Sequence, residues 1–502
     1  MRSAPTISLM ESFLAALRRT KILLALVLLP VGGCTVGPNY HTPTVQIPAG
    51  YKEARNWAPA QPNDQNLGGT WWTIFQDPRL DALELQVNVS NQNLKAAEAQ
   101  YQQARDILRY YRSNYFPTVT VAPSASRTLI SNNAPPPGST LDGVTYNDFE
   151  VPFDMSYEVD AWGQVRRTVE SYREQAQASA ADLATVNLSM HADLAVDYFL
   201  ARSLDAEQEL LNSTVTQYEQ ALQLVQSQYT GGIASELEVQ QALTQLETTR
   251  AEAIDVGVAR AEYEHAVAVL VGQPPADFSL APLALVAPPP PIPVSLPSEL
   301  LERRPDIAAA ERMVAAANAQ IGVAKSAYYP LLDLGAAGGF ESSTITTLIQ
   351  GPSGLWSFGL SAAETVFDAG RRRAATDEAI AAYDQTVANY RETVLTGFQQ
   401  VEDNIAALRI LEGEAQVQQR AVVAAQNYLA LATTRYQGGV TSYLEVTTAQ
   451  TAALSDEVTA VNILGRRMVD AVLLIQALGG GWDRSQLPAH PACCGTQVSD
   501  GG

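Results

Sequence analysis

The sequence predicts a mixed α and β fold that is built twice, with each half contributing one long helical hairpin and one β-hairpin. The stretch between Gly163 and Gly231 contains neither Gly nor Pro, which allows one helix of about 67 residues. A corresponding stretch runs from Gly370 to Gly438. Gly163 and Gly370 are 207 residues apart, and so are Gly231 and Gly438. A chain of 502 residues with this spacing divides into similar halves of about 200 residues. Two segments with strand-like alternation supply the β component.

Each long segment is predicted to be one arm of a coiled-coil hairpin, because its apolar residues recur in alternating steps of four and three. In the first copy these residues are Val165, Val169, Tyr172, Ala176, Ala180 and Leu183, then Leu211, Val215, Tyr218, Leu222, Val225 and Tyr229. Both segments close on a double glycine, Gly231-Gly232 and Gly438-Gly439, which ends a helix, and Ser235 or Ser442 can cap the next one. The tip of each hairpin should therefore lie far from its base.

The N-terminus has the features of an export signal. Basic residues up to Lys21 precede a short apolar run, which ends in Val-Gly-Gly-Cys34. This ending resembles a bacterial lipobox, which implies cleavage before Cys34 and lipidation of that residue; an ordinary signal peptide followed by a buried Cys is the alternative. The residue after Cys34 is Thr35, whereas lipoproteins retained in the inner membrane have Asp there. By resemblance to sorted lipoproteins, this favours the outer membrane over the inner one.

The next segment is rich in Pro, Asn and Gln without an apolar period, so an extended tether is expected up to Asn66. Trp71 and Trp72 then precede a helix that should run to about Asn114. The pair could contact a membrane interface, but packing beneath the start of a helix is the expected role.

Two segments change the apolar period from 3.6 to 2 and are predicted to be β-hairpins. In the first, apolar residues from Phe149 to Val159 alternate with a face that carries five carboxylates, namely Asp148, Glu150, Asp154, Glu158 and Asp160. The second alternates less strictly from Trp356 to Val366. Each half should supply one hairpin, which gives four strands per chain, and the acidic face should meet water.

Four strands cannot close a membrane barrel alone, since the smallest such barrels have about eight. Three chains would supply twelve strands around an acidic, water-filled lumen that should favour cations. The long helices are polar on every side but their seams, so they should continue the barrel as a soluble tube.

The prolines mark a linker between the halves, because Pro274 to Pro297 holds a dense Pro-rich stretch and the long helices have none. The segments expected are 1–33, signal peptide; 34–78, acylated tether; 79–116, periplasmic helix; 117–161, first β-barrel hairpin; 162–273, first long helical hairpin; 274–297, Pro-rich equatorial linker; 298–329, periplasmic helix; 330–368, second β-barrel hairpin; 369–478, second long helical hairpin; 479–502, disordered tail.

Composition argues against several classes of function. A net charge of −21 and a pI near 4.6 disfavour nucleic acid as a partner. The four histidines are scattered, so the sequence offers no nucleophile–base pair or metal cluster, and no enzyme activity, metal or cofactor is expected. The neighbouring Cys493 and Cys494 have no metal-ligand spacing and sit in a segment expected to be a dispensable tail.

Taken together, these features resemble the outer membrane efflux factors of the TolC type, specifically the lipoprotein branch that serves resistance-nodulation-division pumps. The resemblance covers nearly the whole mature chain. It is carried by Cys34 to Tyr40, Trp71-Trp72 to Pro78, Leu301 to Asp306 and the duplicated Tyr-x-Gly-Gly tips. It implies a homotrimer that forms a twelve-stranded outer membrane barrel on a long periplasmic helical tube. It also implies a periplasmic adaptor protein and an inner-membrane pump as partners.

The same resemblance implies a gate at the hairpin tips. By position, the gate tyrosine is Tyr436 and the acidic gate residues are Glu238 and Glu445, while Thr441 stands where the family has an arginine. Arg435 is the candidate substitute for that arginine. For both acids, a solvated position on the hairpin is the alternative. The tips themselves, Gly231, Gly232, Gly438 and Gly439, would dock the adaptor or the pump.

The function that follows is a passive exit duct for small toxic compounds, lipid-anchored in the outer membrane with a large periplasmic part. A duct for polypeptides of type I secretion is the alternative within transport. A coiled-coil spacer between envelope layers is the alternative outside it, and the alternating acidic strands disfavour a spacer because it needs no wet barrel. The substrates and the individual pump are not encoded in these features.

Overall fold

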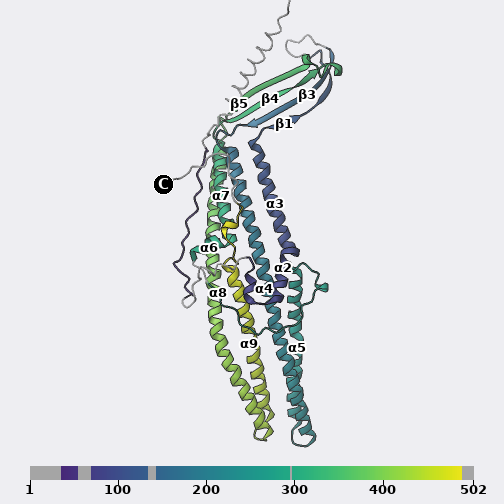
Figure 1. Ribbon diagram of the computed structural model, residues 1–502, viewed down its shortest axis with the longest axis vertical. Helices are drawn as coiled ribbons and strands as arrows, with labels where there is room; N and C mark the ends of the chain where they lie inside the picture. The colour runs from purple at the N-terminus through teal and green to yellow at the C-terminus, as the bar shows by residue number, and fades with distance from the viewer. Residues whose placement is uncertain (1–34, 55–68, 134–142, 294–296, 489–502) are drawn as a thin grey trace, which may run out of the picture. The chain divides into compact units, whose positions relative to one another are not determined.

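The computed structural model describes residues 35–54, 69–133, 143–293 and 297–488. The expected signal peptide and Cys34, Cys493 and Cys494 lie outside these ranges. The chain forms two compact units: unit 1 takes in the residues up to Tyr40, 108–172 and 316–383, and unit 2 takes in the rest. Figure 1 shows the elements along the chain.

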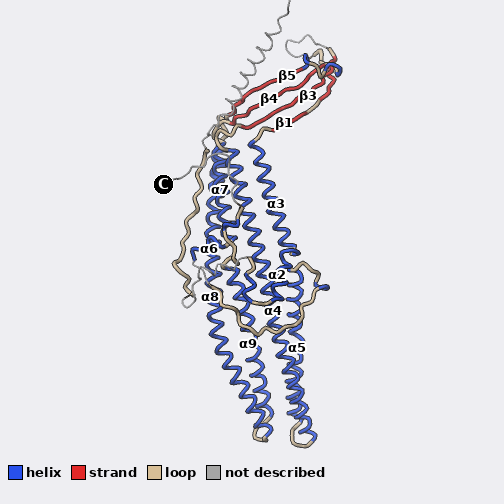
Figure 2. Tube along the Cα trace, in the orientation of Figure 1, coloured by secondary structure: helices blue, strands red, loops and turns tan. Residues whose placement is uncertain are grey.

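Unit 1 contains one antiparallel sheet, drawn in red in Figure 2. Its strands are β1 (Thr118–Val121), β2 (Ser124–Leu129), β3 (Thr145–Glu158), β4 (Leu331–Ser342) and β5 (Gly354–Ala363). The order is β1-β3-β4-β5, and β2 also pairs with β3. The first hairpin therefore lies directly beside the second, because β3 of one half pairs with β4 of the other along ten residue pairs.

The expected count of four strands is wrong by one, because the first arm of the first hairpin is divided into β1 and β2. The break falls at Ala122-Pro123, and proline has no N–H to donate to the ladder. The register continues across the break, since Val121 faces Phe153 and Ser124 faces Glu150. The two short strands thus occupy the place of the single strand that the alternation predicts.

The long helices are confirmed. α4 (Gln164–Thr230) and α8 (Arg371–Gln437) each have 67 residues, and the hairpins are completed by α5 (Glu236–Leu270) and α9 (Tyr443–Ala477). Many predicted seam residues of the first copy are buried, among them Val165, Val169, Tyr218 and Val225, and so are Tyr390 and Val394 of α8. Among the described residues, none of the helices is both long and apolar enough to cross a bilayer.

The helix expected from residue 79 to about 114 is interrupted, and forms α2 (Pro78–Ser90) and α3 (Gln92–Arg112). Asn91 between them has extended backbone, with φ −62° and ψ 126°. Its side-chain oxygen accepts the N–H of Leu94 at 2.9 Å and its amide donates to the carbonyl of Leu270 at 2.9 Å. Asn91 therefore caps α3 and ties it to the end of α5, which is a long-range contact that helical periodicity does not report.

The helix after the linker also has two parts, α6 (Pro297–Arg303) and α7 (Pro305–Ser326). Pro305 begins α7, as expected for a proline in a first turn. Between the two, Arg304 donates to Asp306 at 2.6 and 3.0 Å, to Gln400 at 2.8 Å and to the carbonyl of Ala477 at 3.1 Å. One guanidinium thus joins α7 to α8 and to the end of α9.

The Pro-rich linker is bound to the first helical hairpin by a cluster of charges. Asp205 on α4 accepts from Arg202 and Arg260, both at 3.0 Å, and from the backbone N–H of Leu283 at 2.9 Å. Arg202 also donates to the carbonyl of Ala281 at 2.7 Å. These bonds hold the linker against α4 and α5. Arg202 and Arg260 donate to linker carbonyls, and the N–H of Leu283 in the linker donates to Asp205.

Residues 479–488 make defined contacts, so the expectation of a disordered tail from residue 479 is wrong for these ten residues. Trp482 and Leu487 pack against a buried cluster of Ala181, Ala308 and Ala309. Arg484 donates to the buried carboxylate of Glu311 at 3.0 Å. The two large apolar side chains and the ion pair offset the entropy of ordering the segment.

The tryptophan pair has the packing role. Trp71 and Trp72 form the short 3₁₀ helix η2 (Trp71–Phe75) and are each 2% exposed. Trp72 stacks on His191 of α4 with 4.5 Å between the ring centroids. His191 is in turn buried against Glu84 of α2, whose side chain is fully buried.

Glu84 and His191 share one proton. His191 Nε2 lies 3.2 Å from Asn88 Oδ1, which also accepts from Asn187, so Nε2 carries a hydrogen and Nδ1, 2.5 Å from Glu84, is the acceptor or the site of the shared proton. Burial, and secondarily Asp81, raises the pKa of Glu84 to about 9, and burial lowers the pKa of His191 to about 4. At neutral pH the pair is therefore an uncharged carboxylic acid beside a neutral imidazole.

This pair predicts a pH-dependent local stability. In the unfolded chain the two groups titrate near pH 4.5 and 6.5, so folded and unfolded forms each hold one proton between these values. Above pH 6.5 the unfolded pair releases its proton while folded Glu84 keeps its own up to about pH 9, so stability falls by about 1.4 kcal/mol per pH unit. Glu84→Gln cannot titrate, and should abolish this decline. Hydrogen exchange of the α2 amides between pH 6.5 and 9 measures it.

The matched control is Glu98→Gln, which removes an exposed carboxylate from α3. It should retain the decline of the wild-type protein. If the local stability of α2 declined equally with pH in the wild type and in Glu84→Gln, Glu84 would not carry the shared proton.

Candidate gate at the hairpin tips

The two hairpin tips of unit 2 are built by the same backbone arrangement (Figure 1). After α4, the N–H of Ile233 donates to the carbonyl of Gln228 at 2.8 Å; after α8, the N–H of Val440 donates to the carbonyl of Arg435 at 2.9 Å. Both bonds close the end of a helix across six residues. They require a left-handed residue at the second glycine, where Gly232 has φ +74° and Gly439 has φ +71°.

A buried apolar cluster joins the two hairpins near their tips. Its members come from all four long helices and are Val225, Ala242, Ala432, Tyr443, Val446 and Ala449. Partly buried Leu222, Val239, Leu429 and Tyr436 pack against it. The two tips therefore form one packed body within the chain, and movement of one hairpin against the other would expose this cluster.

Tyr436 makes a hydrogen bond that crosses between the hairpins. Its hydroxyl donates to Gln228 Oε1 on α4 at 2.8 Å, and its ring meets Tyr443 edge-on at 5.1 Å. Burial, with a smaller contribution from Glu238, raises the pKa of Tyr436 above its usual value. The hydroxyl thus stays protonated and able to donate at physiological pH.

Glu445, in the first turn of α9, is held by two partners in its own chain. The hydroxyl of Thr441 donates to one oxygen, and Arg435 lies 3.5 Å from the other. Thr441 and Arg435 therefore both contact the same carboxylate, and Arg435 is the cation beside Glu445. Because Arg435 is 55% exposed, this ion pair adds little to stability on its own.

Glu238 occupies the equivalent position in the first turn of α5, where its surroundings differ. It accepts the backbone N–H of Ser235 at 2.8 Å, which is half of a capping box. Ser235 and Ser442 are the N-cap residues of α5 and α9, as their positions after the double glycines predict. No bond joins Glu238 to Glu445 among the described residues of the single chain.

Large apolar side chains are exposed at both tips, at positions that the duplication relates. Ile233 and Val440 follow the double glycines, and Leu237 and Leu444 lie in the next turn. Exposed apolar groups of this size at two matched positions indicate a surface that contacts another protein.

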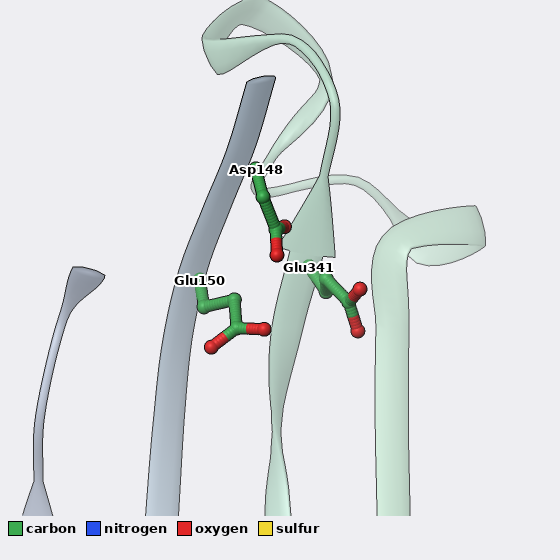
Figure 3. Close-up of side chains that lie close together, drawn as sticks. All are labelled: Asp148, Glu150 and Glu341. Atoms are coloured by element: carbon green, nitrogen blue, oxygen red, sulfur yellow. The ribbon is translucent and has the colours of Figure 1, made fainter. Parts of the chain in front are cut away.

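The acidic strand face is present in unit 1. Asp148 and Glu150 on β3 and Glu341 on β4 gather there, and one oxygen from each lies within 4.8 Å of the others (Figure 3). Glu150 and Glu341 are direct cross-strand partners. Like charges placed opposite each other are unfavourable unless water or counterions screen them, which indicates that this face is wet.

Sequence reasoning missed several tip residues. Gln228 belongs to no motif of its own, although the spacing of 207 residues makes it the counterpart of Arg435 and thus marks a position where the two halves differ. Tyr443, which is buried between the hairpins, stands where the first half has exposed Glu236. The exposed apolar positions could have been found from the same spacing.

Comparison with known proteins finds a family with these features. The model of the outer membrane efflux protein family matches residues 85–273 and 296–480, one segment for each half. The toluene efflux pump outer membrane protein TtgI of Pseudomonas putida is 32% identical over 477 residues, covering 91% of this chain and 98% of the relative. The cation efflux system protein CusC of Escherichia coli is 29% identical over 466 residues, covering 92% and 99%.

Among solved structures, the outer-membrane channel OprN matches with a TM-score of 0.84 at 29% identity, covering 89% of this chain and 100% of that one. The duplicated fold of helical and β-hairpins is therefore that of TolC-type efflux channels.

The tips predict a sharp difference between neighbouring glycines. Replacing the left-handed Gly232 and Gly439 with Ala should cost roughly 1–2 kcal/mol at each tip. Gly231→Ala and Gly438→Ala are the matched controls, because neither glycine has a positive φ and an added Cβ would make ordinary contacts at 3.4 Å. Faster hydrogen exchange of the Ile233 and Val440 amides in the first pair alone is expected. Equal exchange in both pairs would contradict the assigned turn geometry.

Proposed function

The chain belongs to the outer membrane efflux protein family, and from this premise we propose that it is the outer membrane channel of a tripartite efflux system. Three copies form a passive exit duct, and an inner-membrane pump supplies the energy through a periplasmic adaptor. The observation that carries the proposal is the combination of an open antiparallel sheet, acidic on one face, with two long helical hairpins in one chain.

The trimer is supported by the edges of the sheet. Within the described residues, β1 and β2 form one edge and β5 the other, and neither edge is covered by a further strand. Backbone groups at an open edge cannot remain unpaired in hydrocarbon. If β5 of each copy pairs with β1 and β2 of the next, three copies close a barrel with every edge paired, and the divided arm counts as one of its twelve strands.

The cargo is proposed to be small toxic compounds. Relatives carry names that refer to toluene, solvents, antibiotics and cations, so the family's outer membrane component serves pumps with different cargo. These names favour a pump over a type I secretion system. A duct of this kind needs no catalytic group, and we propose none.

The exposed apolar residues of the tips are the proposed docking surface for the adaptor or the pump. Ile233, Leu237, Val440 and Leu444 would be covered by helices of that partner. The double glycines Gly231-Gly232 and Gly438-Gly439 set the sharp turns that present these side chains.

We propose that Cys34 is the lipidated N-terminus of the mature chain. The lipobox-like Val-Gly-Gly-Cys34 supports this. The residues that follow are fixed in unit 1, since Val36 donates to the carbonyl of Trp162 at 3.0 Å and Asn318 donates to that of Pro38 at 3.1 Å. Mass spectrometry of the mature N-terminal peptide should show a diacylglyceryl and an acyl group, and a peptide of unmodified mass would rule out the anchor.

The gate is proposed to be locked mainly within the second hairpin and between the hairpins. Tyr436 holds α8 to α4 through Gln228, while Thr441 and Arg435 hold Glu445. Thr441 then replaces the family's arginine by fixing the carboxylate directly, with Arg435 as the cation. Glu238 contributes through the cap of α5 and its proximity to Tyr436.

Removing these bonds should open the channel. Tyr436→Phe with Glu445→Gln keeps the size and packing of both side chains but removes the hydroxyl and the charge. Loss of the Tyr436–Gln228 hydrogen bond alone, at about 1 kcal/mol in each of three copies, would shift the ratio of open to closed forms by on the order of 100-fold. Purified protein in planar bilayers should then show higher single-channel conductance.

The matched control is Tyr229→Phe with Glu236→Gln, which removes the same groups from the first tip. No hydrogen bond of these two side chains is found among the described residues. An unchanged conductance in the Tyr436/Glu445 variant, or an equal rise in the control, would remove Tyr436 and Glu445 from the lock.

Reversal potentials under a KCl gradient should show a preference for cations, and the failure of the wild type and every variant to conduct would overturn the channel itself.

A further inference from the structure

The first turn of α8 carries the only run of three consecutive basic residues in this acidic chain, Arg371, Arg372 and Arg373. β5 ends at Ala363 and α8 begins at Arg371, so the run lies where the sheet gives way to helix. All of the residues concerned belong to unit 1. A concentration of positive charge in a protein of net charge −21 calls for a local cause.

Arg372 is used inside the fold. It donates to Asp368 at 2.7 Å and to Glu364 at 2.9 Å, and its guanidinium lies over the ring of Tyr328 at 5.4 Å from the centroid. Asp368 also accepts the backbone N–H groups of Gly370 and Arg372. The first amides of α8 and the middle arginine are therefore already satisfied, so a ligand would meet the flanking side chains and not the helix terminus.

Arg371 and Arg373 have no comparable role. Arg373 is 85% exposed and its nearest carboxylate oxygen, on Asp377, is 3.8 Å away and also exposed, a pairing that adds almost nothing to stability. Arg371 is exposed and forms no ion pair with any residue that the structure describes. Cations in the first turn of a helix are also disfavoured by its dipole. Neither side chain is explained by the stability of the chain itself.

Exposed apolar and aromatic groups lie near this pair in the sequence or next to Arg372 between them. Val366 and Phe367, just before the arginines, are 92% and 85% exposed. Tyr328 and Tyr329 precede β4 and are about half exposed, and Tyr329 stacks on Trp162 with 4.9 Å between centroids. Aromatic residues gathered at the ends of membrane strands are typical of the boundary between hydrocarbon and water.

We propose that Arg371 and Arg373 bind the phosphate groups of anionic phospholipids at the periplasmic surface of the outer membrane, with Phe367 and Val366 lying among the upper acyl chains. The occupant is inferred from the charge and from the adjoining residues. Two exposed guanidinium groups, of which only Arg373 has a weak partner among the described residues, favour an anion, and the adjoining apolar groups favour one that carries hydrocarbon. The proposal rests on the proposed function, because it needs the strands of unit 1 to lie in a membrane.

The test is native mass spectrometry of the detergent-purified full mature protein, titrated with phosphatidylglycerol or with phosphatidylcholine of identical acyl chains. The wild type should prefer phosphatidylglycerol. Two basic residues near a lipid surface contribute about fivefold each, so Arg371→Ala with Arg373→Ala should reduce this preference by about 25-fold. Added salt should weaken the preference of the wild type alone.

The matched control is Arg391→Ala with Arg420→Ala, which removes two exposed arginines from the part of α8 that belongs to unit 2, and it should retain the preference. Equal binding of the two lipids by the wild type, or a preference that survives in the Arg371/Arg373 variant, would overturn the proposal. So would displacement of phosphatidylglycerol by an equal concentration of inorganic phosphate, because the site would then bind a free anion. If the same spectra show that the variant has lost the trimer while its protomers keep the preference, the two arginines belong to a contact between copies and the proposal fails.

Bilayer conductance of the same preparation separates this inference from the proposed function. A wild type that conducts but shows no lipid preference refutes only the lipid surface. A wild type that never conducts refutes the channel.

Discussion

The antiparallel pairing of β3 with β4 is the interaction on which the organisation of unit 1 depends. It joins the two halves of a duplicated chain into one sheet, and it brings the carboxylates of Glu150 and Glu341 opposite each other. A sheet built this way has one face that needs water and two edges that need partners. Neither need can be met by a single chain in lipid, so the pairing that completes the fold of one copy also makes an assembly necessary.

In unit 2 the corresponding constraint is the packing of two long hairpins against each other. The tips are held by short, specific contacts: a buried cluster around Tyr443 and the bond between Tyr436 and Gln228. Most of the remaining polar contacts at the tips are local caps, such as Glu238 on the N–H of Ser235. Few of the polar bonds there cross between the hairpins, so the buried cluster and the Tyr436–Gln228 bond are the contacts that the proposed gate has to release.

The elements that the sequence predicts correctly are those whose ends are set by local residues such as Gly and Pro. The absence of Gly and Pro from Gln164 to Thr230 determines the length of α4, and the double glycines determine where it ends. The elements that it does not predict depend on contacts between distant residues. The break at Asn91 comes from a bond to the carbonyl of Leu270, and the order of the segment around Trp482 comes from alanines on α4 and α7.

The candidate site divides in the same way. Tyr436, Glu238 and Glu445 are identified as gate candidates by the resemblance to the TolC-type family, but their partners are not, because side-chain pairing between helices has no signature in one sequence. Glu84 and His191 show the same limit: separated by 107 residues, each reads as an ordinary helical residue, and only the fold reveals a buried pair that shares a proton.

The two tips have the same backbone and different side-chain chemistry, and in the proposed gate this difference places the control in the second tip. Each position in the first tip has a counterpart 207 residues later, yet Gln228 corresponds to Arg435 and Glu236 to Tyr443. The substitutions give the second tip a cation beside Glu445 and an aromatic ring in the buried cluster. The first tip supplies the acceptor, Gln228, for the tyrosine of the second. The two halves keep the same turn but differ at these residues. In the proposed gate, the hairpin that carries Tyr436 is therefore the one whose release from Gln228 would open the duct.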